Sequence, residues 1–180
     1  MSFVFQYGSN LSTARLNGST RLQGDARMVG EAVTQDDYEF EFDIWSEADG
    51  GRAAADIVAG NGRKIWGVIY EIPDYLIRRE TAKAKQRKSL DAIEGEGGNY
   101  ERVVIKLQWA DGRPVAEQVI TYIGKARRSG IKTTQDYVNH ILTGLAEHDF
   151  PAEYVSYVKS RILANNPSMM AEIHNSAAGH

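Results

Sequence analysis

The sequence predicts an α+β fold, in which a mixed β-sheet of about six strands curls into a barrel-like core with helices packed outside it. Strand-like segments occupy the first two-thirds of the chain, with helical segments between them, and two longer helical segments follow. The order lacks the regular strand–helix alternation of a doubly wound parallel sheet. These observations favour a mixed sheet over a parallel one.

The first three expected strands lie in the N-terminal quarter of the chain. Residues 2–6 form a short apolar run, and residues 26–33 form a second strand in which Gly30 is suited to a bulge. Residues 38–44 read YEFEFDI, with large apolar residues alternating strictly with acids. This period of two is typical of a strand with one buried face.

Two further strands and two helical segments lead to the middle of the chain. Small and apolar residues predict strands at 53–59 and 64–72, and the near-continuous apolar run of the latter indicates burial on both faces. Asp74 is suited to cap a helix over residues 75–87. The stretch SLDAIEG predicts a short helix that stops at Gly95.

The last third begins with an expected hairpin, whose two apolar arms flank the turn sequence ADGRP. A helix over residues 135–147 follows, and another starts at Pro151 and ends near residue 163. Residues 166–180 are small and polar, which predicts a poorly ordered tail. We therefore expect a single domain over residues 1–165.

Composition narrows the class of protein. The 180 residues are 42% hydrophobic and 25% charged, with a net charge of −3, values typical of a globular domain. The small negative charge argues against a nucleic-acid partner. The chain has no cysteine and no apolar run long enough to span a membrane, and its N-terminus lacks a secretory signal pattern, so we expect a cytoplasmic protein. The spacing of the four histidines predicts no metal site.

The first candidate site residues, Gly8, Ser9 and Asn10, directly follow the first strand. Such residues often cap a helix, here one expected over residues 11–17. Alternatively, their backbone N–H groups bind an anion, since such groups point at a ligand where a helix begins. The local pattern is compatible with both interpretations.

The second candidate is Glu94, which directly precedes Gly95 at the end of the short helix. The negative end of the helix dipole, repulsion from Glu96 and Glu101, and burial in an apolar pocket would each raise the pKa of the Glu94 carboxyl. A carboxyl with a pKa near neutrality can transfer protons at pH 7. The alternative is a surface loop with several exposed acids.

These two stretches, VFQYGSNL and LDAIEGEGGNY, together resemble the gamma-glutamylcyclotransferases, including gamma-glutamylamine cyclotransferase and AIG2-like proteins. GGRAAADI followed by KIWGVIYEI resembles the central strands of that family. QDYVNHILTGLAEHDFPAEYVSYVKSRI resembles the C-terminal helix pair of its member in glutathione metabolism. The resemblance covers residues 3–162 in the family's order.

The resemblance implies a gamma-glutamylcyclotransferase-like fold and an acyltransferase activity. The reaction converts a γ-glutamyl group to 5-oxoproline and releases an amino acid or amine. The resemblance implies no metal and no organic cofactor, and it is compatible with a homodimer. Two alternatives stay open: an enzyme of the same fold acting on a γ-glutamylamine or a biosynthetic γ-glutamyl intermediate, and a small-molecule-binding module without catalysis.

The resemblance also assigns site residues. Glu94 corresponds to the catalytic general acid and base. The expected substrate-binding residues are Val4, Phe5, Gln6, Tyr7, Gly8, Ser9 and Asn10 in the N-terminal loop, and the pocket aromatics Tyr100, Tyr122 and Tyr137.

Overall fold

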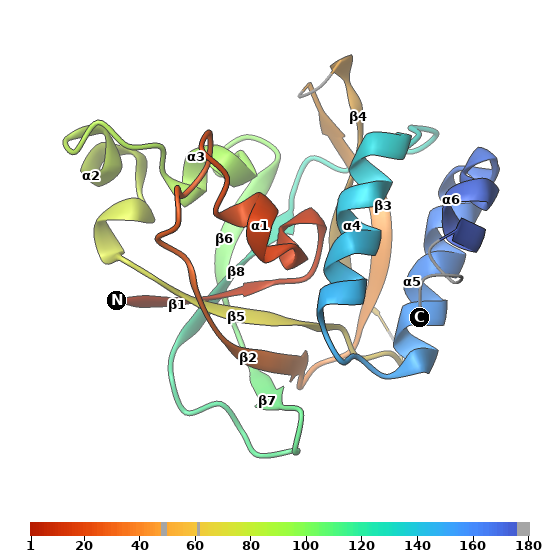
Figure 1. The fold of residues 1–180 in the computed structure, drawn as a ribbon, viewed down its shortest axis with the longest axis horizontal. Coiled ribbons are helices and arrows are strands. Elements are labelled where there is room, and N and C mark those ends of the chain that lie inside the picture. The colour runs from red at the N-terminus through yellow and green to blue at the C-terminus, as the bar shows by residue number, and fades with distance from the viewer. Residues whose placement is uncertain (48–49, 61, 176–180) are drawn as a thin grey trace.

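A six-stranded sheet, a separate two-stranded sheet and flanking helices make up the computed structural model, which describes residues 1–47, 50–60 and 62–175 (Figure 1). The predicted α+β class and curled mixed sheet are confirmed. The strands are β1 Ser2–Gln6, β2 Arg27–Thr34, β3 Tyr38–Ser46, β4 Arg52–Ala59, β5 Trp66–Ile72, β6 Tyr100–Ile105, β7 Leu107–Trp109 and β8 Val119–Gly124. The helices and 3₁₀ turns are η1 Ser9–Leu11, α1 Thr13–Leu16, η3 Asp74–Leu76, α2 Arg79–Lys83, α3 Leu90–Glu94, α4 Gln135–Glu147, α5 Ala152–Asn165, η4 Pro167–Met169 and α6 Met170–Asn175.

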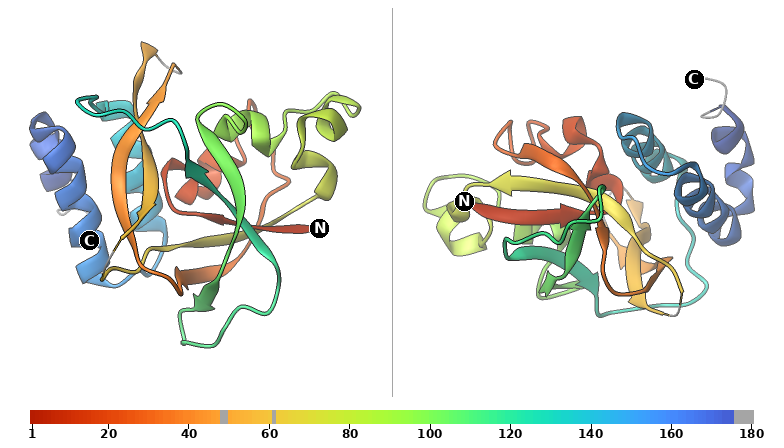
Figure 2. Two further views of the ribbon diagram at one scale, coloured as in Figure 1. Left: turned by 180° about the vertical axis from the view of Figure 1, so that it is seen from behind. Right: turned by 90° about the horizontal axis from the view of Figure 1, so that it is seen from below.

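The larger sheet curls because its two edge strands are consecutive in the chain. Its strand order is β6-β8-β1-β5-β2-β7, and only Lys106 separates β6 from β7. A single extended segment therefore pairs with β8 at one edge and with β2 at the other (Figure 2). The expected hairpin is confirmed, since β6 pairs with β8 and Gln108 of β7 forms an antiparallel bridge with Pro114 across the turn. On its other side β7 also pairs with β2.

Strand β1 lies inside this sheet, antiparallel to β5 and parallel to β8. The strands β3 and β4 pair with each other in a separate two-stranded sheet, so the curled sheet itself holds six strands, as predicted. The bulge predicted at Gly30 is confirmed, since the register between β2 and β5 shifts between Met28 and Gly30.

The helix predicted over residues 75–87 is wrong. The structure has the turn η3 there, followed by the five-residue helix α2. Asp74 does not cap a helix, because its carboxylate accepts hydrogen bonds from the N-terminal amino group, at 2.8 Å, and from the Ser2 hydroxyl, at 2.7 Å. A contact distant in sequence thus replaces the expected local cap.

The helix expected over residues 11–17 is also shorter, and Ser9 and Asn10 do not cap it. The Ser12 side chain caps α1 by accepting from the backbone N–H of Arg15. Ser9 and Asn10 instead lie in η1, which begins without a side-chain cap. Their small polar side chains therefore need an explanation other than helix capping.

The C-terminal helices α4 and α5 agree with prediction, but part of the expected tail is helical. Asn166 accepts a hydrogen bond from the backbone N–H of Ser168, and Met169 is buried against the core, so η4 and α6 follow α5. Residues 176–180 lie outside the described residues. Within the described ranges, no helix is both long and apolar enough to cross a membrane.

Helix α4 packs closely on the segment that follows β1. A Cβ atom added at Gly144 would lie 2.4 Å from the Leu11 Cβ and 2.8 Å from the Ser12 backbone nitrogen, so only glycine allows this approach. Leu11 is fully buried beneath the helix. The chain after β1 is thereby held between the sheet and α4, as Figure 1 shows.

Candidate functional site

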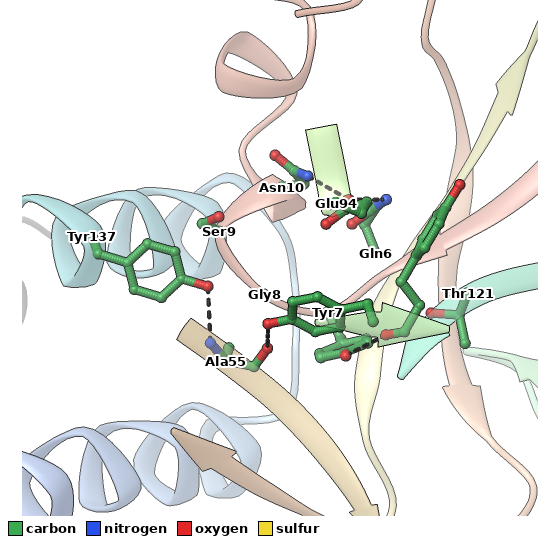
Figure 3. Close-up of a pocket in the computed structure, with 11 residues that line it drawn as sticks. Gln6, Tyr7, Gly8, Ser9, Asn10, Ala55, Glu94, Thr121 and Tyr137 are labelled. Carbon is green, nitrogen blue, oxygen red and sulfur yellow. Dashed lines mark hydrogen bonds between the residues drawn. The ribbon is translucent and has the colours of Figure 1, made fainter. Parts of the chain in front are cut away.

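A cavity lies at the C-terminal end of β1. Because β8 runs parallel to β1 and β6 antiparallel to β8, the end of β8 and the start of β6 meet at this place. The cavity is narrow, about 30 Å³. Its walls are Gln6, Tyr7, Gly8, Ser9, Asn10, Ala55, Glu94, Tyr100, Thr121, Tyr122 and Tyr137 (Figure 3).

Glu94 reaches the cavity because α3 ends there. The Ser89 side chain caps the start of α3, and Gly95 ends the helix with a φ of +73°, a left-handed conformation that glycine adopts without strain. The Glu94 Oε1 atom accepts hydrogen bonds from Asn10 Nδ2, at 2.7 Å, and from Gln6 Nε2, at 3.0 Å (Figure 3). The Oε2 atom has no hydrogen-bond partner among the described residues.

Burial raises the pKa of the Glu94 carboxyl above its ordinary value. The charge of Arg21, the hydrogen bonds from Asn10 and Gln6, and the charge of Arg15 partly oppose this effect. The expected repulsion is not among the main causes, because Glu96 pairs with Arg79 at 3.0 Å. The raised pKa is therefore as predicted, but burial and not neighbouring acids produces it.

Three tyrosines that line the cavity donate their hydroxyl protons to other groups of the protein. Tyr7 donates to the carbonyl oxygen of Tyr122, at 2.6 Å, and Tyr100 donates to that of Ala55, also at 2.6 Å. The Tyr122 hydroxyl donates to Asp91, at 2.7 Å, and Asp91 in turn pairs with an arginine of β6. These three tyrosines thus form rigid walls, and their hydroxyl protons are already engaged.

Tyr137 connects α4 to strand β4 across the cavity. Its hydroxyl accepts the backbone N–H of Ala55, at 3.0 Å, and also hydrogen-bonds with Ser9. The hydroxyl of Tyr100 donates a hydrogen bond to the carbonyl oxygen of Ala55. Both backbone polar groups of Ala55, the N–H and the carbonyl, therefore find tyrosine hydroxyls as hydrogen-bond partners.

The loop after β1 presents backbone donors at the cavity. Within the described part of the chain, no group accepts a hydrogen bond from the backbone N–H of Gly8, Ser9 or Asn10. All three residues line the cavity, and the side chains of Ser9 and Asn10 are buried. An anion could therefore be bound here by neighbouring N–H groups.

Val4 and Phe5 do not line the cavity. Both side chains are buried in the hydrophobic core, at 0% and 1% exposure, so they pack there instead of facing the cavity. The other predicted residues, from Gln6 to Asn10 with Glu94, Tyr100, Tyr122 and Tyr137, all line it. Sequence reasoning missed Ala55 and Thr121, whose position depends on long-range strand pairing and which carry no local signal.

A second, outer hollow of about 210 Å³ adjoins the first and shares Ser9, Glu94, Tyr100 and Tyr137 with it. Its other walls include three arginines that no motif of the sequence singled out: Arg15, Arg21 and Arg52.

Across residues 1–47, 50–60 and 62–175, no three histidine, aspartate or glutamate side chains gather in a group that could hold a metal ion. His148 instead contacts the carbonyl oxygen of Leu11, at 3.0 Å.

A family model described as "Gamma-glutamyl cyclotransferase, AIG2-like" matches residues 4–139. No protein in a search of curated sequences matches significantly.

Solved structures with the same fold include one described as a gamma-glutamyl cyclotransferase, with a TM-score of 0.67 and 22% identity over 88% of this chain and 86% of that one. An uncharacterized protein from Homo sapiens has a TM-score of 0.69 and 24% sequence identity, over 88% of this chain and 86% of that protein. YkqA from Bacillus subtilis has a TM-score of 0.68 and 23% sequence identity, over 91% of this chain but only 55% of the YkqA chain. At these identities the likeness shows the fold alone.

Proposed function

The chain belongs to the gamma-glutamyl cyclotransferase, AIG2-like family, and from this premise we propose that it cyclises a γ-glutamyl compound to 5-oxoproline and releases an amino acid or amine. The observation that carries the proposal is Glu94. A carboxyl with a raised pKa borders a cavity, one of its oxygens is held by two amide side chains, and the other has no protein partner among the described residues. This arrangement suits proton transfer.

In the proposed reaction, the α-amine nitrogen of the γ-glutamyl group forms a bond to the γ-carbonyl carbon, and the bond from this carbon to the leaving nitrogen breaks. Glu94 takes a proton from the attacking amine and gives it to the leaving nitrogen. Because both reacting groups belong to one molecule, the protein contributes most by holding the bent conformer. No nucleophilic side chain is needed.

The Gly8–Asn10 loop has a role in this proposal as the anion-binding element. Its backbone N–H groups would bind either the substrate α-carboxylate or the oxyanion that develops on the γ-carbonyl oxygen. Both anions would lie close to Glu94, since Asn10 belongs to this loop and donates to the Glu94 carboxylate. Tyr7, Tyr100 and Tyr137 would then restrict the conformations of the bound chain.

The test is the formation of 5-oxoproline, measured by mass spectrometry after incubation with a panel of γ-glutamyl peptides and γ-glutamylamines. We expect turnover by the wild-type protein, and a loss of about 10²–10⁴-fold in kcat for Glu94→Gln. The matched control is Glu96→Gln, which removes an acid two residues away that lies outside the cavity and pairs with Arg79.

The proposal is wrong if no γ-glutamyl compound is converted between about pH 6 and pH 9. Wild-type turnover by a folded Glu94→Gln variant would remove Glu94 from the mechanism. Tight binding of γ-glutamyl compounds without conversion would identify the chain as a binding module.

A further inference from the structure

The C-terminal end of helix α4 holds the chain directly after the Gly8–Asn10 loop, where α4 lies beside α1 (Figure 1). Glu147 is the last residue of α4, and its carboxylate accepts two hydrogen bonds. The Ser12 hydroxyl donates to Oε1, at 2.9 Å, and the Thr13 backbone N–H donates to Oε2, at 2.8 Å. Both carboxylate oxygens are therefore bound to the segment that follows the loop.

The Thr13 N–H is one of the backbone donors that a helix cannot satisfy by itself. Thr13 is the first residue of α1, so its N–H has no carbonyl partner inside that helix. The Ser12 side chain caps the same helix by accepting from the Arg15 backbone N–H. The Glu147 carboxylate thus fixes both the residue that begins α1 and the residue that caps it.

Leu11, the next residue toward the loop, is held by the same end of α4. Its carbonyl oxygen lies 3.0 Å from His148 Nε2 and accepts a hydrogen bond from the Tyr70 hydroxyl, also at 3.0 Å. Its backbone N–H donates to the Gly8 carbonyl oxygen, at 3.0 Å. A series of hydrogen bonds therefore leads from the end of α4 to the first residue of the loop.

This attachment affects how the loop can bind an anion. The backbone N–H groups of Gly8, Ser9 and Asn10 have no acceptor among the described residues, and η1 begins without a side-chain cap. The loop conformation is therefore set by the elements on either side of it, β1 before and the Leu11–Thr13 segment after. Backbone donors that are fixed before a ligand arrives bind it at a lower cost in ordering.

We propose that Glu147 is a positioning residue for the reaction, which holds the Gly8–Asn10 loop in the conformation that binds the substrate anion. The proposal rests on the proposed function. Glu147 lines neither the cavity nor the outer hollow, so it acts through Ser12 and Thr13 and not by contact with the substrate. This role requires hydrogen-bonding atoms at the end of α4 but no negative charge.

The first test compares Glu147→Ala with Glu147→Gln. The alanine variant loses both hydrogen bonds, and we expect its kcat/KM for a γ-glutamyl compound to fall about tenfold. The glutamine variant keeps an oxygen for the Thr13 N–H and offers an amide N–H to the Ser12 hydroxyl, so its kcat/KM should stay within about threefold of the wild-type value. Equal losses in the two variants, or wild-type kcat/KM in the alanine variant, would overturn the proposal.

The control for the first test is Glu153→Ala, assayed like the other variants well below its Tm. Glu153 is an exposed glutamate in the first turn of α5 and lines neither the cavity nor the outer hollow. Its replacement should leave kcat/KM unchanged even where it lowers the Tm. A loss of kcat/KM equal to that of Glu147→Ala would assign the effect to general stability and overturn the proposal.

The second test removes the donor instead of the acceptor. Thr13→Pro deletes the N–H that Glu147 binds, and proline suits this position because Thr13 begins the helix and Ser12 before it is extended. Thr13→Ala is the matched control, since it keeps the N–H and loses only the hydroxyl bonded to Tyr70. Relative to this control, Thr13→Pro should lower kcat/KM about tenfold in the wild-type background but have little further effect in Glu147→Ala. Losses that multiply in the double variant would contradict the proposal.

A measurement without turnover separates this proposal from the proposed function. NMR relaxation reports the order of the backbone N–H groups of Gly8, Ser9 and Asn10 in the protein without substrate. We expect their order parameters to fall in Glu147→Ala and to keep wild-type values in Glu147→Gln, whether or not the wild-type protein forms 5-oxoproline. Unchanged order parameters in Glu147→Ala would overturn the positioning role even where the activity assay shows turnover.

Discussion

The two oxygens of the Glu94 carboxylate have different surroundings. Asn10 and Gln6 both donate to Oε1, which fixes the orientation of the group, whereas no described residue donates a hydrogen bond to Oε2. Hydrogen bonds to the charged form of a carboxyl stabilise that form, while burial disfavours it. The raised pKa of Glu94 is the outcome of these opposing effects, with burial the larger.

Replacement of Asn10 by alanine should shift the pH dependence of the reaction. The variant loses the 2.7 Å hydrogen bond that lowers the Glu94 pKa, so the pKa rises further. In the proposed reaction the ionised carboxylate takes the proton from the amine, so the acid limb of kcat/KM should move to higher pH. A pH–rate profile measures this shift.

The control for this prediction is Gln35→Ala. Gln35 donates an amide hydrogen bond to the Leu107 carbonyl oxygen, away from Glu94, so its loss should leave the acid limb in place. An unchanged acid limb in Asn10→Ala would show that the bond seen here does not control Glu94.

At the scale of elements, helix α4 positions the loop after β1. The helix supplies Tyr137 to the cavity, and the absence of a side chain at Gly144 lets it approach Leu11 and Ser12. The same loop contains the Gly8–Asn10 segment. Packing of one helix thus determines where both the tyrosine and the backbone donors lie.

Gly144→Ala should separate α4 from this loop. The added Cβ would lie 2.4 Å from Leu11 and 2.8 Å from a backbone atom of Ser12, so the backbones must move apart. Overpacking typically costs about 1–3 kcal/mol, which here should outweigh the roughly 1 kcal/mol that alanine gains over glycine in a helix. Denaturant unfolding measures the loss of stability, and kcat should fall with it.

Thr143→Ala is the matched control for that substitution. Thr143 is exposed on the same helix, so its replacement should change the free energy of unfolding by less than about 0.5 kcal/mol. Equal stability of the Gly144→Ala and Thr143→Ala variants would mean that close packing at Gly144 is not needed.

At the scale of the whole molecule, an acidic pair joins the two sheets. Asp56 of β4 is fully buried and accepts hydrogen bonds from the backbone N–H of Gly124, at 2.6 Å, and from Arg127 Nε, at 2.9 Å. Asp43, at the bulge of β3, lies 3.5 Å from the same arginine nitrogen. Two carboxylates therefore share one guanidinium where the small sheet meets the large one.

This junction predicts a pH-dependent stability. Burial raises the pKa of Asp43 to about 6, with the charges of Asp56 and Glu41 adding to the effect and that of Arg127 opposing it. A raised carboxyl pKa in the folded state means that stability is greatest below the unfolded pKa and is lost as the pH rises through about 6. Asp43→Asn should remove this loss.

Thermal unfolding at several pH values tests the prediction. The difference in Tm between Asp43→Asn and the wild type should increase from about pH 4 to about pH 7 in favour of the variant. Asp111→Asn is the control. Arg113 lowers the pKa of the exposed Asp111, so the stabilisation from this carboxylate is lost only below about pH 4, and the Tm difference should stay nearly constant from about pH 4 to about pH 7. A Tm difference for Asp43→Asn that does not vary with pH would contradict the assignment.

Local patterns predicted much of the fold and part of the site. The strict alternation of apolar and acidic residues predicted β3. The glycine at position 95 predicted where α3 ends, and therefore that Glu94 is the last residue of this helix. The prediction failed where a distant contact replaced a local one. Asp74 was expected to cap a helix but binds the N-terminus, and Val4 and Phe5 were expected at the cavity but pack in the core.

The sequence by itself determined where β1 ends, where Glu94 lies along its helix, and which family pattern the chain carries, because alternation, capping and turn residues act over a few positions. Only the tertiary structure decided that β1 and β8 end at the same place, that α4 packs on the loop after β1, and that Arg15, Arg21 and Arg52 lie in the same hollow as Glu94. These arrangements depend on pairing and packing between distant segments, which no local pattern records.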